Sequence, residues 1–362
     1  MVETYRMKAL DLKIRLQICI SSLLVIFGNW KLSLYMFSLV FWMMTVFHFE
    51  VQAFGTVQLF GQNTEHEKIT RIALRCRDDN PASCFQKRTL DSLAGSDGTF
   101  GAVGAPDPGP TLFRFFAHCS GGDFLSGVNY PRSAEKAREA LEICRRYMTI
   151  QLELAMRSAA SLLNEEGVIE ASQTASILPC GYAEGVDKRG KCKVLKHFGS
   201  VLHASQDFYA HSNWVDEADP SKPIGRDNPP GLEQRGRAPW LDLRVTEPDF
   251  PEGLISGCGG IDAITDGEGG CTSKTGRLRI QHNALNKDNG KISLDNGYSI
   301  GAGSTPRGEV NQNFLHAVEA AIDDTVDKWK MLREMLVQRY GAEQGTRMIC
   351  VLTTDRPEKD CQ

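Results

Sequence analysis

The sequence predicts an all-α fold, and three observations lead to that expectation. Four stretches of the chain show helical periodicity, and strand signals are few and short. The segments between these stretches are rich in Gly and Pro, which is typical of long loops. The chain has 11 cysteines, enough to pin such loops with disulfide bonds. We therefore expect a mainly helical chain with long disulfide-pinned loops.

The four predicted helices are recognised by apolar side chains at three- and four-residue steps. In the first, Thr64 is a good N-cap, and Ile69, Ile72 and Cys76 share one face. The fourth ends near Gly341. The predicted helices span residues 65–77, 133–165, 193–214 and 311–340, and the long loops span residues 95–110, 216–251 and 257–307.

The composition is that of a globular protein, with 362 residues, 41% apolar and 24% charged. These values exclude disorder and low-complexity fibres. The 41 Lys and Arg against 45 Asp and Glu give a net charge of −4, which does not indicate a polybasic surface for nucleic acid. Charge alone identifies no partner, and no protein partner can be inferred from the sequence.

The N-terminal segment resembles an export signal. Basic residues precede an apolar stretch over 16–30, and an uncharged stretch over 32–49 follows. Small residues at the first and third positions of Val51-Gln52-Ala53 suit a signal peptidase, which would make Phe54 the mature N-terminus. We predict a signal peptide over 1–53 and therefore secretion. The alternative is an uncleaved N-terminal anchor that keeps the protein attached to a membrane.

Cleavage there would leave an even number of cysteines, which favours disulfides in an exported chain. Short spacings suggest consecutive pairing, although spacing alone leaves other pairings open. The suggested pairs are Cys76 with Cys84, Cys119 with Cys144, Cys180 with Cys192, Cys258 with Cys271, and Cys350 with Cys361. We expect a single α-helical domain over 54–345 and a C-terminal tail over 346–362 that a disulfide pins.

The strongest chemical signal is a polar stripe on the third predicted helix. His203, Asp207 and His211 are spaced by four residues, so they lie along one side of an α-helix. Imidazole and carboxylate groups at this spacing can share a metal ion. The alternative is a polar stripe that is solvated or capped.

Three further histidines are candidate ligands. His316 and Glu319 are one turn apart, although such a pair alone more often lies on a surface. His118 lies in a loop with acids on both sides, where the alternative is a buried ring satisfied by the backbone. His66 opens the first helix, where the helix N-terminus lowers an imidazolium pKa and keeps the ring neutral for metal.

Four patches between residues 60 and 325 carry a family resemblance. They are Glu65-His66-Glu67-Lys68-Ile69-Thr70-Arg71, Leu202-His203-Ala204-Ser205-Gln206-Asp207-Phe208-Tyr209-Ala210-His211-Ser212-Asn213-Trp214, Leu285-Asn286-Lys287-Asp288 and His316-Ala317. The second patch, over residues 202–214, is the most specific. The chain resembles the heterokaryon-incompatibility-C-like branch of the zinc-dependent phospholipase C and single-strand-specific nuclease superfamily.

This resemblance implies a phospholipase C-like zinc-binding bundle that holds one to three zinc ions. Three ligand sets are carried over by motif. The first is Phe54, through its terminal amine and carbonyl, with His66 and a bridging Asp207. The second is Asp107, His118, His203 and Asp207, and the third is His211, His316 and Glu319. Asp123 competes with Asp107 for the ligand role. Whichever of the two is not a ligand would accept a proton from the attacking water as a catalytic base.

The expected function is a secreted zinc-dependent phosphodiester hydrolase in which metal-activated water attacks phosphorus. Its substrate would be a phospholipid or another phosphodiester, and the mildly acidic chain makes single-stranded nucleic acid less favoured. The alternative is a catalytically inactive, zinc-stabilised secreted recognition or toxin-like protein. For Asn286 and Asp288 the simplest interpretation is a capped turn near the site.

Overall fold

The computed structural model describes residues 54–56, 63–77, 84–96, 99–108, 114–127, 129–176, 178–182, 186–259, 271, 279–295 and 303–361. All of them belong to Val51–Gln362, the second of two units into which the chain divides. The predicted signal peptide or anchor over 1–53 lies outside the described residues, which begin at Phe54. In the described part, no helix combines the length and apolar character needed to cross a membrane.

The described residues are mainly helical, which confirms the predicted class. The main helices are α3 (Glu65–Leu74), α4 (Lys87–Ala94), α5 (Ala134–Ala159), α7 (Gly190–His211), α9 (Asn313–Tyr340) and α10 (Ala342–Thr353). Three single-turn helices are α6 (Ala171–Thr174), α8 (Pro306–Glu309) and α11 (Pro357–Asp360). Five short 3₁₀ turns are η2 (Phe115–Ala117), η3 (Ala160–Leu162), η4 (Pro239–Leu241), η6 (His282–Ala284) and η7 (Val310–Gln312). Among the described residues, β-pairing is limited to isolated bridges.

The four predicted helices correspond to α3, α5, α7 and α9, with ends that differ by a few residues. The sequence pattern missed α4 and α10, which are short. The segment predicted as a tail over 346–362 contributes to α10 and α11. α10 packs closely on α9 because Gly345 has no side chain: a Cβ there would lie 2.6 Å from the Cα of Val337.

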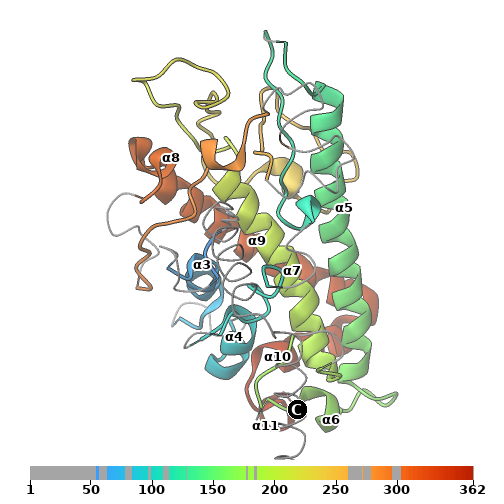
Figure 1. Ribbon diagram of the computed structural model, residues 1–362. Coiled ribbons are helices and arrows are strands. Elements are labelled where there is room, and N and C mark those ends of the chain that lie inside the picture. Colours follow the sequence, from blue (N-terminus) through green and yellow to red (C-terminus); the bar gives the residue numbers. More distant parts are fainter. Residues whose placement is uncertain are drawn as a thin grey trace, which may run out of the picture. The chain divides into compact units, whose positions relative to one another are not determined.

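Helix α7 is the central scaffold. It packs against α5 and α9 and also contacts α3, as Figure 1 shows. From Val201 to its end at His211 every side chain is buried, so apolar residues such as Leu202 and Phe208 hold the helix in place. Each large apolar side chain buried in this way contributes about 1.5–3 kcal/mol. The polar stripe on α7 is therefore carried by a rigid element.

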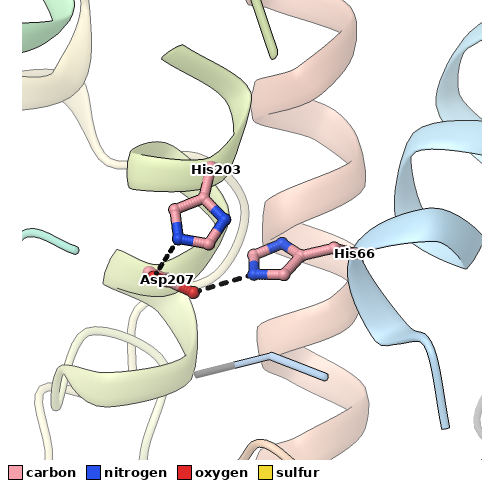
Figure 2. Close-up of side chains that lie close together, drawn as sticks. All are labelled: His66, His203 and Asp207. Carbon is pink, nitrogen blue, oxygen red and sulfur yellow. Dashed lines mark ion pairs between the residues drawn. The ribbon is translucent and has the colours of Figure 1, made fainter. Parts of the chain in front are cut away.

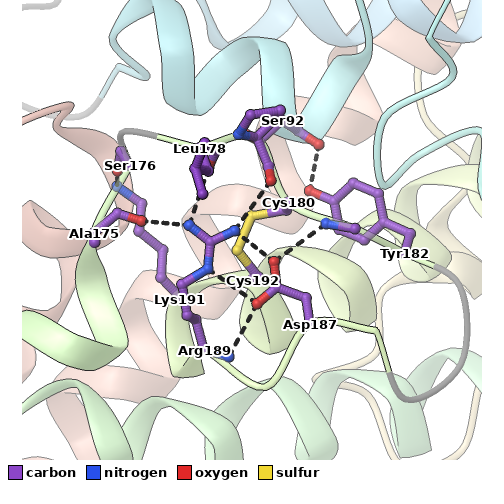
Figure 3. The surroundings of a disulfide bond; sticks show 12 residues. Ser92, Ala175, Ser176, Leu178, Cys180, Tyr182, Asp187, Arg189, Lys191 and Cys192 are labelled. Carbon is purple, nitrogen blue, oxygen red and sulfur yellow. Dashed lines mark hydrogen bonds and ion pairs between the residues drawn. A yellow bond between two sulfur atoms is a disulfide. The ribbon is translucent and has the colours of Figure 1, made fainter. Parts of the chain in front are cut away.

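All five predicted disulfide pairs are present. The Cys119–Cys144 bond ties the loop that contains His118 to α5. The Cys180–Cys192 bond holds the loop before α7, and Figure 3 shows Arg189 bridging Asp187 and the carbonyl oxygens of that loop. Covalent and ionic contacts thus fix both the start of α7 and a loop beside its stripe.

Candidate metal centre

The first group of possible metal ligands consists of His66, Asp107, His118, His203 and Asp207. Helix α3 supplies His66, α7 supplies His203 and Asp207, and two loops supply Asp107 and His118. Their ligand atoms form two overlapping sets, His66–His203–Asp207 and Asp107–His118–His203, and within each set the atoms lie within 4.8 Å of one another. The structure therefore brings together five residues from four segments that are far apart in sequence.

Asp207 is the shared centre of the first group. Its Oδ1 lies 3.1 Å from His66 Nε2, and its Oδ2 lies 2.7 Å from His118 Nδ1 and 3.1 Å from His203 Nε2. Figure 2 shows the rings of His66 and His203 turned toward the two oxygens of this carboxylate. Asp107 joins from the other side, with Oδ1 3.4 Å from His203 Nε2. One carboxylate thus contacts three imidazoles.

Several polar atoms of the first group are buried and make no hydrogen bond, apart from the ion-pair contacts given above. They are Nε2 of His66, Nδ1 of His203, Oδ1 of Asp107 and Oδ1 of Asp207. Buried polar atoms in folded proteins normally have a partner, because leaving one unpaired costs about 1–3 kcal/mol. Imidazole nitrogens and carboxylate oxygens are also the ligands that zinc takes in proteins. The donor set therefore fits a metal ion.

Charges within the first group reinforce one another. Burial alone would raise the pKa of Asp207, but His203 and His66 lower it well below its ordinary value. Burial would lower the pKa of His203, yet the carboxylates of Asp207 and Asp107 raise it to about 10. The pKa of His118 is also raised, because Asp207 outweighs the effect of burial. Without metal, this group holds charged pairs.

A second group consists of His211, His282 and Asp288. His211 continues the stripe of α7 by one turn beyond Asp207, and its Nε2 lies 2.5 Å from Asp288 Oδ1. The rings of His211 and His282 have centroids 3.5 Å apart. Nδ1 of His211 and Oδ2 of Asp288 are buried without a hydrogen-bond partner. These three residues could also hold a metal ion.

The second group is neutral without metal. Burial lowers the pKa of His211 to about 3 and lowers that of His282 well below its ordinary value. Burial, with the negative charge of Asp207, raises the pKa of Asp288 well above its usual range. A neutral imidazole is the form that binds metal.

The extended segment over 255–258 places His282 beside the end of α7. The backbone N–H of Gly257 donates to the carbonyl oxygen of His211, and that of His282 donates to the carbonyl oxygen of Cys258. Asn213 N–H donates to the carbonyl oxygen of Ile255. These bonds join segments that are distant in sequence.

The Asn286-Lys287-Asp288 loop places Asp288. Its middle residue, Lys287, is fully buried and donates from Nζ to the carbonyl oxygen of Ser212 and to Asp216. The N–H of Asp288 donates to Asn286 Oδ1, the capped turn that the sequence predicts. The loop therefore clamps the end of α7 and points Asp288 at His211.

Two side chains predicted as ligands belong to neither group. His316 and Glu319 are half-buried on α9. Burial and the charge of Arg235 lower the pKa of His316, while Glu217 and Asp216 act in the opposite sense. In the described part of the chain, the group that contains His211 is completed by His282 and Asp288 instead.

Phe54 and Asp123 have distinct surroundings. Phe54 is fully buried with its ring 5.9 Å from that of His66, and the N–H of His66 donates to the carbonyl oxygen of Gly55. Asp123 is also fully buried, but both of its oxygens accept hydrogen bonds from Arg279, and one also accepts from Tyr130. Phe54 thus lies beside the first group, whereas Asp123 is held in an ion pair.

Sequence reasoning did not propose His282 or Asp288 as ligands. His282 has no regularly spaced partner in the sequence, and only the Asn-Lys-Asp motif drew attention to Asp288. Cys180, Asp187 and Cys192 form a further cluster of metal-ligating residue types. Both of its sulfur atoms are joined in a disulfide, so the cluster offers no thiolate.

Comparison with known proteins adds no assignment. No protein-family model, no curated protein and no solved structure matches this chain. The resemblance stated from the sequence motifs therefore stays a prediction. The two groups are defined by their geometry and by the atoms that they leave unpaired.

Proposed function

We propose that this protein is a secreted zinc-dependent phosphodiester hydrolase similar to the phospholipases C. The observation that carries the proposal is the convergence of His66, His118 and His203, from three separate segments, on the carboxylate of Asp207. Unpartnered buried atoms in the same group support a metal ion as the missing partner. The residues of the first group would hold one or two ions, and those of the second group would hold another.

Zinc is the metal proposed because every candidate side-chain ligand is an imidazole or a carboxylate. A bound zinc ion supplies Lewis acidity, which lowers the pKa of water and polarises a phosphoryl oxygen. The protein's own contribution is to fix the ligands: α7 is rigid, and the loops that bring His118 and His282 are tied by the Cys119–Cys144 and Cys258–Cys271 disulfides.

Substrate would approach from the side of Asp107 and His118. Their side chains are 18% and 9% exposed, whereas those of His66, His203 and Asp207 are fully buried. Asp107 would accept the proton of the attacking water if it is not itself a ligand. We favour Asp107 over Asp123 for this role because Arg279 and Tyr130 already engage both oxygens of Asp123.

Phospholipid is the favoured substrate. Removal of residues 1–53 changes the net charge from −4 to −6, because five basic and three acidic residues leave with that segment. An acidic chain does not favour the polyanionic backbone of nucleic acid. The five disulfides support secretion, because such bonds persist in oxidising compartments.

A second candidate is a secreted recognition or toxin-like protein that uses zinc only for stability. The full burial of His66, His203 and Asp207 favours it, because structural metal sites have no open position for substrate. In that case the protein would bind zinc and lose stability when chelator removes it, but it would hydrolyse no phosphodiester.

The test compares two histidine variants on one helix. His203→Ala removes the ligand that the two sets of the first group share, whereas His197→Ala is a matched control because His197 lies on α7 but contacts Gln151 instead. Zinc content by mass spectrometry and hydrolysis of a panel of phospholipids and oligonucleotides are measured for both. We expect His203→Ala to lose zinc and hydrolysis and His197→Ala to retain both. If the wild-type protein binds zinc but hydrolyses no substrate faster than His203→Ala, the second candidate function is supported. If the wild-type protein contains no zinc, both candidate functions are contradicted.

A further inference from the structure

Gln206 is a fully buried polar residue one position before Asp207 on α7. Its side-chain oxygen lies 2.7 Å from Nδ1 of His66 on α3. Its side-chain nitrogen donates to the hydroxyl oxygens of Thr70 on α3, at 3.1 Å, and Thr325 on α9, at 3.0 Å. One amide group thus joins three helices next to the first group.

The hydroxyl of Thr325 fixes which way this amide points. A hydroxyl has one proton, and that of Thr325 is donated to the carbonyl oxygen of Ala321 at 2.7 Å. Thr325 Oγ1 can therefore only accept from Gln206, so the NH₂ end of the amide faces the two threonines. The oxygen end consequently faces His66, and a carbonyl oxygen can only accept a hydrogen bond. Nδ1 of His66 must then carry a proton.

We infer that Gln206 is a positioning residue that holds His66 in the Nδ1–H tautomer, which leaves the lone pair on Nε2 directed at the metal. His66 Nε2 is the atom that faces Asp207 Oδ1, and it has no other hydrogen-bond partner. Metal-binding histidines commonly donate their second ring nitrogen in this way, which fixes both tautomer and ring orientation. The role of Nε2 as a ligand rests on the proposed zinc function, whereas the tautomer does not.

The same helix offers a matched control. His197 Nδ1 lies 2.8 Å from the side-chain oxygen of Gln151 on α5, so the chain contains a second His–Gln pair of the same type. His197 belongs to neither metal group. Replacing Gln151 with Leu removes the same kind of hydrogen bond without touching the first group.

The test reads the imidazole proton directly. Long-range ¹H–¹⁵N NMR of the labelled, metal-free full chain reports whether each ring nitrogen of His66 carries a proton. We expect the wild type and Gln206→Glu, which keeps an acceptor oxygen, to carry a His66 proton on Nδ1, whether or not Nε2 is also protonated toward Asp207. Gln206→Leu removes the acceptor of Nδ1, so the proton should be found on Nε2, which faces the carboxylate of Asp207. A wild-type ring without a proton on Nδ1, or a Gln206→Leu spectrum unchanged from wild type, would overturn the inference.

Zinc affinity gives the second readout. We expect Gln206→Leu to weaken zinc binding about 10–100-fold, the usual effect of losing a hydrogen bond behind a ligand, while Gln206→Glu retains most of it and Gln151→Leu all of it. Equal weakening in Gln206→Leu and Gln151→Leu would indicate a general loss of packing and would contradict the positioning role. If the wild type carries the proton on Nδ1 but binds no zinc, the proposed function fails while the assignment of Gln206 to the His66 tautomer is supported.

Discussion

The two groups of candidate ligands lie one turn apart on α7. In the metal-free protein, however, the pKa values of their histidines and aspartates are shifted in opposite directions. In the first group the pKa of His203 is raised to about 10 and that of Asp207 is lowered. In the second group the pKa of His211 is lowered to about 3 and that of Asp288 is raised. The same residue types are thus charged in one group and neutral in the other.

The difference comes from the number and surroundings of the carboxylates. Two carboxylates, Asp107 and Asp207, face the histidines of the first group, so each proton on a ring is stabilised by opposite charge. The second group has one carboxylate, and the nearby charges of Asp207 and Lys287 act against ionisation of Asp288 and protonation of His211, respectively. Burial then decides the outcome. A metal ion would displace protons from the histidines of the first group. In the second group it would displace the proton of Asp288.

The largest expected effect is that of Asp207→Asn. The change removes the charge that three histidines share, so we expect zinc to be lost from the first group and retained by the second. Breaking buried ion pairs by removing one partner costs about 3–5 kcal/mol, so the metal-free protein should also unfold more easily. Zinc content and urea unfolding in chelator measure the two effects. Loss of all zinc would show that the two groups are not independent, and unchanged metal-free stability would contradict the charged pairs of the first group.

The next effect distinguishes His282 from His316 as the histidine that shares a metal site with His211. We expect His282→Ala to lower zinc content by one ion and to leave the first group loaded, because His282 completes the second group in the structure. His316→Ala should leave zinc content unchanged. The reverse pattern would favour the ligand set of His211, His316 and Glu319 that the sequence resemblance implies. Zinc content per chain, with an unfolding curve to check the fold, decides between them.

The pH dependence of metal-free stability should have opposite slopes for the two groups. The pKa of His203 is raised in the folded state, so its contribution is full below about 6.5 and is lost as the pH rises toward about 10. The pKa of His211 is lowered, so the unfolded state binds the extra proton, and stability falls as the pH drops from about 6.5 toward 3. Denaturant unfolding in chelator should therefore lose its alkaline slope in His203→Gln and its acidic slope in His211→Gln. Identical slopes in both variants and the wild type would contradict the contrast.

The smallest expected effect is that of Asp288→Asn on metal-free stability. Because the pKa of Asp288 is already raised by burial, the change replaces one neutral group with another of similar shape. We expect less than about 1 kcal/mol by urea unfolding, well below the cost of Asp207→Asn. Zinc should still be lost from the second group, because an amide is a poorer ligand than a carboxylate. A stability loss as large as that of Asp207→Asn would show that Asp288 is charged after all.

Much of the fold follows from local patterns. Apolar spacing identified α3, α5, α7 and α9 because long amphipathic helices repeat their signal over several turns. Short spacings between cysteines suggested the five disulfides that the structure contains, since residues 8 to 25 apart close small loops. The short helices α4 and α10 were missed because eight to twelve residues carry too little repetition, and α10 depends on its close approach to α9 at Gly345.

The candidate site was predictable only in part. The four-residue spacing of His203, Asp207 and His211 placed them on one stripe, because that arrangement is a property of the helix itself. The same kind of spacing suggested His316 and Glu319, but periodicity does not say which residues approach a helix from outside. His282 reaches α7 through backbone hydrogen bonds of the 255–258 segment, which leave no periodic trace in the sequence.

The sequence by itself determined the helical class and the polar stripe of α7 and suggested the disulfide pairs, because each depends on residues that are near one another along the chain. Only the tertiary structure decided which side chains meet that stripe. It brought His66, His118 and Asp107 to one turn and His282 and Asp288 to the next. It also set the opposite charge states of the two groups, because burial and the balance of neighbouring carboxylates are properties of the packed chain.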